Sequence, residues 1–212
     1  MGDALLAIDT DAVASRLARH PWVASARVHR ELPSTFAIEI VERHAAALTI
    51  IGGLYLIDDN GHPFKRANLD ETSGLVVLTG VSRKEYVELR EVCEAAMRGA
   101  LALLADYQHP DTLAVARTSQ GPERGRPALS EIHIDARKGY TLVLYEGGGQ
   151  VHLGRGDFGG KLARFDEIVA DLRTASAKIG GGSPVSGLAG VSVVHLEGEA
   201  TDRVPILFKP EG

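Results

Sequence analysis

Hydrophobic and polar positions change their spacing along this chain, and the first change separates a short helix from a hairpin. Val13 and Leu17 stand four residues apart within residues 9–20, which is typical of an amphipathic helix. Asp9 or Asp11 can cap its first turn. One helix cannot bury its apolar face alone, so this segment needs a partner to pack against.

From Trp22 the spacing shortens to about two residues, which predicts a β-hairpin over residues 22–43. Pro33 and Ser34 fit its turn. Trp22 follows the helix-stopping Pro21, so we expect its ring to anchor the helix to the hairpin. A two-stranded sheet is marginal in water unless something covers it. The apolar positions on one face of its second strand are Phe36, Ile38 and Ile40.

Short alternating segments continue beyond residue 45 and predict a larger, mostly antiparallel sheet with two flanking helices, which makes the fold class α+β. The predicted strands are a meander over 46–58 that continues into HPFK, then 75–80, three strands within 130–154, 190–198 and a last strand over 203–210. Residues 83–107 are predicted as the longest helix and residues 161–177 as another. The first of these helices is expected to bury a stripe of apolar side chains, which consists of Tyr86, Leu89, Val92, Cys93, Ala96, Met97, Ala100 and Leu104. Loops are expected at 108–127 and 180–187.

Composition narrows the class of protein. The 212 residues are 44% hydrophobic and carry a net charge of −5, which suits one ordinary core or two small ones and argues against a general nucleic-acid binder. The single cysteine, Cys93, excludes a disulfide within the chain and is interpreted as a small buried side chain, with a reactive thiol as the alternative. The written sequence contains no run of eighteen apolar residues and no signal peptide, so taken literally it predicts a cytosolic chain.

Gly154, Gly156 and Gly159 have the spacing G-x-G-x-x-G between a predicted strand and a predicted helix, which raises the possibility of a phosphate site. We expect residues 151–154 to belong to an antiparallel meander, whereas a dinucleotide-binding unit needs a parallel strand and a doubly wound sheet. The chain also lacks a lysine and a Ser or Thr hydroxyl at the positions that a P-loop requires. We therefore interpret the glycines as a sharp strand-to-helix turn, with Asp157 as the helix cap.

The sequence contains few other arrangements of residues that could support metal binding or catalysis. The eight histidines are scattered, and the only pair that could face one another, His133 and His152, is separated by a third strand. No nucleophile motif is present, and Asp58 and Asp59 fit a turn before Asn60. We expect no catalytic residue, no cofactor and no metal site.

Two sets of motifs carry a resemblance over almost the whole chain. The first is HPWVASARVHRELPSTFAIEIVER, residues 20–43. The second comprises YLIDDNGHPF, LGRGD at 153–157, LARF at 162–165 and VVHLEG. Together they closely resemble the FtsQ/DivIB family of bacterial division proteins, with the first set similar to the second half of a POTRA domain.

The resemblance implies a domain organisation and a function. Residues 1–44 would be the C-terminal part of a POTRA domain and residues 45–212 an FtsQ/DivIB-type β domain. The family is a non-enzymatic divisome scaffold of the cell inner membrane that binds FtsB and FtsL in the periplasm. Its membrane helix and the first strand and helix of the POTRA domain are absent before Leu5, so we expect a truncated sequence or a misplaced start.

A partner-binding edge is expected at the last strand, because an unpaired sheet edge can bind a partner strand through backbone groups. We expect Pro205 to point its nitrogen to the side where no ladder bond is needed. The resemblance implies that FtsB adds a strand here and that Lys138 is the basic turn residue that meets an acid of FtsB. A second family contact, an arginine, is Glu197 in this chain. The expected partner-binding residues are Lys138, Arg203, Val204, Ile206, Leu207, Phe208 and Lys209.

Two alternatives remain open at this point. The half that ends in VER is shared with POTRA-bearing modules of secretion or outer-membrane assembly. The glycine motif leaves a small-ligand or nucleotide-binding enzyme as the other alternative.

Overall fold

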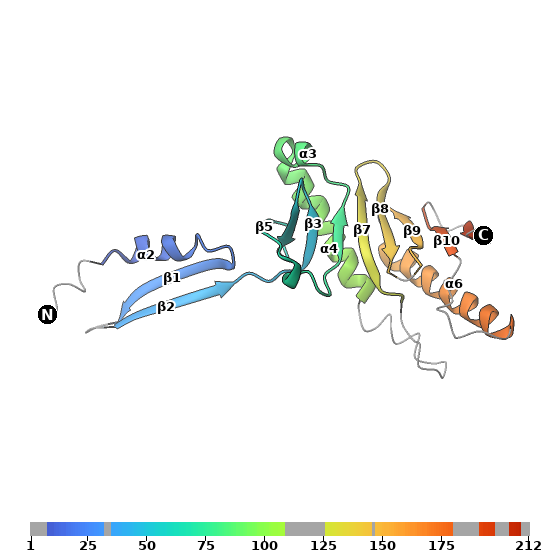
Figure 1. The fold of residues 1–212 in the computed structure, drawn as a ribbon, viewed down its shortest axis with the longest axis horizontal. Coiled ribbons are helices and arrows are strands. Elements are labelled where there is room, and N and C mark those ends of the chain that lie inside the picture. Colours follow the sequence, from blue (N-terminus) through green and yellow to red (C-terminus); the bar gives the residue numbers. More distant parts are fainter. Residues whose placement is uncertain are drawn as a thin grey trace.

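The computed structural model describes residues 8–31, 35–108, 126–145, 147–179, 191–197 and 204–208. They form a helix with a two-stranded hairpin, followed by a nine-stranded sheet with its helices (Figure 1). The α+β class expected from the sequence is confirmed.

The first unit consists of α2 (Thr10–Leu17), β1 (Val23–Glu31) and β2 (Thr35–Glu42), which we call the hairpin unit. Asp9 caps α2, since its carboxylate accepts hydrogen bonds from the backbone N–H groups of Asp11 and Ala12 at 3.0 and 3.1 Å. The two strands pair antiparallel. The predicted helix and hairpin are thus confirmed, while the expected turn at Pro33 and Ser34 lies outside the described residues.

The second unit, which we call the sheet unit, has its strands in the order β11-β10-β9-β8-β7-β6-β3-β4-β5. The pairs β3–β6, β6–β7 and β9–β10 are parallel and the other pairs antiparallel. Its strands are β3 (Ala47–Ile50), β4 (Leu54–Ile57), β5 (Pro63–Arg66), β6 (Val77–Thr79), β7 (Leu129–Asp135), β8 (Gly139–Leu144), β9 (Gln150–Gly154), β10 (Val191–His195) and β11 (Ile206–Phe208).

Two long helices, α4 (Arg90–Gln108) and α6 (Phe158–Ile179), lie in the connections between parallel neighbours and contact each other. The core lies between them and the sheet, where Met97, Phe165, Ile132 and Leu142 are fully buried. Along β7 the alternate residue His133 is exposed, so strand alternation separates an apolar face from a polar one.

The prediction of one helix over 83–107 is wrong. The chain forms α3 (Arg83–Glu88) and α4, with a break at Leu89, whose φ and ψ are −132° and 45°. Leu89 and Val92, expected in the buried stripe, are 54% and 63% exposed. The longest described helix is α6 with 22 residues, against 19 in α4. A short 3-10 helix, Leu69–Glu71, lies between β5 and β6.

A buried arginine joins the last turn of α4 to a side chain of α6. Arg126 donates from Nε and Nη2 to the carboxylate of Asp166 in α6 at 2.8 and 2.9 Å. Its Nη1 donates to the carbonyls of Asp106 and Tyr107 at 3.0 Å, which satisfies the last turn of α4. A bidentate arginine with further backbone acceptors is well satisfied in a buried position, so it fixes α4 against α6.

The two units meet at a small aromatic and ionic contact. Trp22 lies edge-on to Phe64 of β5, with ring centroids 5.3 Å apart. Arg43 donates to Asp58 at 2.7 Å, and both side chains are largely buried. The Trp22 ring is half-buried and packs against the sheet unit, while its expected role of anchoring the helix to the hairpin stays a prediction.

Candidate partner-binding edge

The last strand, β11, forms one end of the nine-stranded sheet. It pairs antiparallel with β10, with Val194 opposite Ile206 and Val193 opposite Leu207. A register shift follows, so that Val191 stands opposite Phe208. Among the described residues β10 is the only strand beside β11, so the other side of β11 is an open edge.

Core contacts and exposed apolar side chains coexist on this strand. Val204 and Ile206 pack against the core of the sheet unit. Leu207 and Phe208 are 54% and 61% exposed. The edge is therefore anchored from one side while it presents large apolar groups to solvent, a combination that suits a partner strand.

The expectation for Pro205 is corrected. The backbone N–H of His195 donates to the Pro205 carbonyl at 3.1 Å, so that carbonyl faces β10. In extended antiparallel backbone the nitrogen and oxygen of one residue point to the same side, so the Pro205 nitrogen also faces β10. The N–H and C=O groups of successive residues in a strand point to opposite sides. Those of Ile206 and Phe208 therefore point to the open side, and those of Leu207 point toward β10.

A row of polar side chains crosses the exposed sheet face beside this edge. Thr141 Oγ1 lies 3.0 Å from His152 Nδ1, and the rings of His152 and His195 stack with centroids 4.9 Å apart. The two histidines are neighbours in the parallel pair β9–β10. The sequence pointed to His133 and His152, which indeed have Thr141 between them, but the pair of stacked rings was missed because β9–β10 pairing was not predicted.

The groups around His152 shift its pKa in opposite directions. Burial lowers the pKa of His152, and the neighbouring His195 lowers it further. Glu197, whose carboxylate is 3.6 Å from His152 Nδ1, acts in the opposite direction. Glu197, which follows β10, is therefore an acid at the position where the family resemblance implies an arginine.

Lys138 lies in the tight turn between β7 and β8. The carboxylate of Asp135 accepts hydrogen bonds from the backbone N–H groups of Lys138 at 2.8 Å and Arg137 at 2.7 Å, and these bonds lower the pKa of Asp135. The Lys138 amine is exposed, and its charge also lowers the pKa of His152. The turn is thus held rigid while the amine is presented to solvent.

The expected site residues fall into three groups. Arg203 and Lys209 lie outside the described residues. Val204, Ile206, Leu207 and Phe208 come together on the edge. Lys138 lies in the β7–β8 turn, on a different segment from these four residues.

The glycine turn after β9 is confirmed. The structure argues against a phosphate site there for a different reason from the one given by the sequence. Gly154 and Gly156 have φ values of 68° and 63°, a backbone conformation that residues with a side chain rarely adopt. As expected, β9 pairs antiparallel with β8, but it also pairs parallel with β10 across α6. The helix N-terminus is nevertheless occupied, since Asp157 accepts from the Gly160 N–H at 3.2 Å, and Lys161 donates to two backbone carbonyls of the turn.

The lone thiol and the acidic and histidine side chains form no further candidate site among the described residues. Cys93 is buried, and burial raises the pKa of its thiol, which favours the interpretation as a core side chain. Within the described ranges, no three His, Cys, Asp or Glu side chains form a group that could hold a metal ion. None of the described helices combines the length and apolar character needed to span a membrane.

Comparison with protein families gives two matches. The family described as cell division protein FtsQ/DivIB, C-terminal, matches residues 47–196. The family described as POTRA domain, FtsQ-type, matches residues 1–43. The first covers the sheet unit through β10, and the second covers the hairpin unit.

Several curated relatives are named cell division protein FtsQ. One from Anaeromyxobacter sp. strain K is 41% identical over 81% of this chain and 54% of its own length. Another from Geobacter sp. strain M21 is 34% identical over 81% of this chain and 59% of its own length. A third from Myxococcus fulvus is 30% identical over 94% of this chain and 61% of its own length. The chain thus spans between half and two thirds of these relatives, and the matches show that it belongs to the FtsQ/DivIB family of cell division proteins.

Proposed function

We propose that this chain is part of a non-enzymatic divisome scaffold that binds FtsB and FtsL and links early and late division proteins. In the full-length protein a membrane helix would anchor it to the inner membrane and hold this region in the periplasm. We divide it into a POTRA part, residues 1–44, and a β domain, residues 45–212. The open edge of β11 is the observation that carries the proposal.

The edge supports strand addition for three reasons. Among the described residues it has a free side, Ile206 packs against the core, and Leu207 and Phe208 are exposed. Main-chain hydrogen bonds to the outward groups of Ile206 and Phe208 would supply affinity, and the exposed side chains would supply selectivity.

A proline substitution at Phe208 tests this proposal directly. Phe208→Pro removes an outward N–H without removing a hydrogen bond to β10. Phe208→Ala also removes the aromatic ring but keeps that N–H, so it is the matched control. Calorimetric titration with the cognate FtsB segment should show much weaker binding for the proline variant than for the alanine variant. Equal affinities for the two variants would mean that this N–H takes no part in recognition.

Charge at the β7–β8 turn gives a second test. Lys138→Glu should weaken FtsB binding more at low salt than at high salt, because an exposed ionic contact is screened. Lys84→Glu, an exposed lysine on α3, is the matched control and should leave binding unchanged. A Lys138→Glu variant with unchanged affinity at low salt would remove this residue from the interface.

A further inference from the structure

A second surface lies at the opposite end of the sheet from β11. A groove of about 330 Å³ separates β4 and β5 from α3. Its aromatic lining comes from Tyr55, Phe64 and Tyr86. The proposed FtsB edge does not include any of these residues, so the groove is a separate site.

The groove is strongly basic although the chain is acidic overall. Lys65, Arg66, Arg83 and Arg90 line it, and none of its lining residues is acidic. Lys65 bonds Glu71 and Arg90 donates to Glu94 at 2.8 Å, so these two charges are compensated from outside the groove. Within the described part of the chain, Arg66 and Arg83 form no ion pair. Their guanidinium groups are therefore available to an anionic ligand.

A glycine turn between β3 and β4 makes room for both arginines. Gly52 has φ +65°, and a Cβ on it would stand 3.0 Å from Cδ of Arg83. A Cβ on Gly53 would stand 3.5 Å from the Tyr55 ring and 3.9 Å from Nε of Arg66. The stems of the arginines and the Tyr55 ring thus crowd around one turn, which places two charges beside an aromatic surface.

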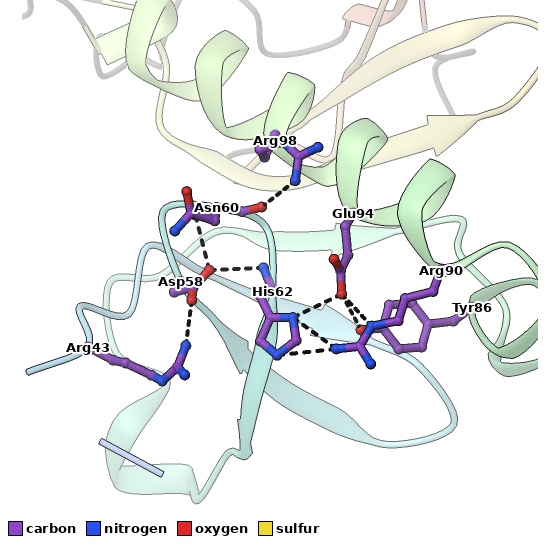
Figure 2. A network of polar contacts seen from close by, with 8 residues as sticks. All are labelled: Arg43, Asp58, Asn60, His62, Tyr86, Arg90, Glu94 and Arg98. Atoms are coloured by element: carbon purple, nitrogen blue, oxygen red, sulfur yellow. Dashed lines mark hydrogen bonds and ion pairs between the residues drawn. The ribbon is translucent and has the colours of Figure 1, made fainter. Parts of the chain in front are cut away.

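One wall of the groove is held in place by a partly buried hydrogen-bond network. Glu94 Oε1 accepts from the Tyr86 hydroxyl at 2.8 Å and from Arg90 Nε at 2.8 Å, and it lies 2.9 Å from His62 Nδ1 (Figure 2). The guanidinium of Arg90 also lies over the Tyr86 ring, 5.8 Å from its centroid. Tyr86 and Arg90 are therefore oriented before any ligand arrives, which lowers the entropy lost on binding.

An exposed apolar side chain extends this surface. Val87 lines the groove and is 75% exposed. Leu89 and Val92, which follow it around the break between α3 and α4, are 54% and 63% exposed. Solvated apolar groups next to a basic groove match a ligand that carries both apolar and acidic groups.

We propose that this groove binds a short acidic segment of a protein partner. An aromatic or aliphatic side chain of the segment packs on Tyr55, Phe64 and Val87, and flanking carboxylates pair with Arg66 and Arg83. A free phosphate would leave the aromatic lining unused.

Titration with labelled peptides tests the proposal on the intact chain. The probe is a fluorescein-labelled peptide of alternating Asp or Glu with Phe or Leu, and its comparison peptide has Lys at every acidic position. We expect saturable binding of the acidic peptide only, weakened about tenfold or more in the double variant Arg66→Glu, Arg83→Glu. Arg27→Glu, an exposed arginine on β1, is the control for a charge reversal outside the groove and should bind like the unaltered chain.

Three results would overturn the proposal. These are no saturable binding of the acidic peptide, equal loss in Arg27→Glu and the double variant, or displacement of the peptide by inorganic phosphate or by vesicles of anionic phospholipid at matched charge. Circular dichroism of the double variant checks that its fold is intact, and Arg66→Gln, Arg83→Gln gives the same comparison with a milder change. The Phe208→Pro variant should bind the acidic peptide normally, so failure at one site is distinguishable from failure at the other.

Discussion

The hairpin unit and the sheet unit have the same kind of apolar alternation, yet they bury it to very different extents. Among the described residues of α2, β1 and β2, only Val23 is buried, and Ile38 and Ile40 are 53% and 48% exposed. In the sheet unit Phe165 and Met97 are fully buried. The same pattern of side chains therefore leads to a core in one unit and to an exposed face in the other.

The difference lies in the layer that covers each sheet. Two helices of 19 and 22 residues cover the sheet unit, whereas α2 has eight residues and none of them is buried. A strand pattern specifies which face is apolar, but burial needs a second layer of matching size. The hairpin unit gains its contacts to the sheet unit instead from Trp22 and Arg43.

The largest effect is expected in the core of the sheet unit. Phe165→Ala removes a fully buried ring between α6 and the sheet and should lower the free energy of unfolding by about 3–5 kcal/mol. Urea denaturation followed by circular dichroism measures this loss. A loss below about 1 kcal/mol would contradict the burial contrast between the two units.

The network around Glu94 should make the sheet unit sensitive to acid. Burial raises the pKa of Glu94, but hydrogen bonds from Arg90, Tyr86 and His62 outweigh it and lower the pKa to about 2 from 4.5. A lowered pKa in the folded state contributes stability that is complete above about pH 4.5 and is lost as the pH falls toward 2. Because the side chain is partly solvated, we expect about 1–3 kcal/mol from this carboxylate.

Urea titrations of the unaltered chain and of Glu94→Gln between pH 7 and pH 2 measure this contribution. The stability difference between the two proteins should be constant above pH 4.5 and should shrink below it. A difference that stays the same throughout would show that the carboxylate charge does not hold Tyr86 and Arg90.

The contact between the units should have a smaller effect. Trp22→Ala removes a half-buried ring that meets Phe64 and Lys65, and we expect a loss of about 1–2 kcal/mol. A double-mutant cycle with Phe64→Leu isolates the ring contact. If the two substitutions act additively, the indole stabilises the protein by some contact other than the one with β5.

The smallest effect is expected on the open face of the hairpin. Ile38→Ser should change the free energy of unfolding by about 0.5 kcal/mol or less, because the side chain is 53% exposed. The same measurement on Ile132→Ser, at a fully buried strand position, provides the contrast. A large loss at Ile38 would show that its face is covered in solution.

Local signals predicted most of the elements. The Asp9 cap, the alternation in β7 to β9, and the glycine turn with Asp157 are each encoded within a few residues, and each is found. The break at Leu89 was missed because no glycine or proline marks it. Contacts of Tyr86 and Arg90 with Glu94 span this break, and such contacts have no signature in the spacing of apolar residues.

The candidate edge was predictable in position and less so in detail. The apolar pattern over residues 203–210 predicted a last strand, and among the described residues β11 lies at one end of the sheet. The side to which Pro205 points depends on its register with His195, and register across a long connection cannot be obtained from alternation alone. The same limit hid the stacked rings of His152 and His195 and the groove between β5 and α3.

The central strand β6 has a consequence for how the protein folds. It joins two groups of strands by parallel pairing: Leu48 and Val77 meet on one side, and Val77 and Glu131 meet on the other. The hairpins within each group close over short stretches of chain, but the β6–β7 pair closes only after α3 and α4 have been traversed. Contacts between residues far apart in sequence slow folding, so we expect closure of this pair to limit the folding rate, with each group of strands forming earlier on its own.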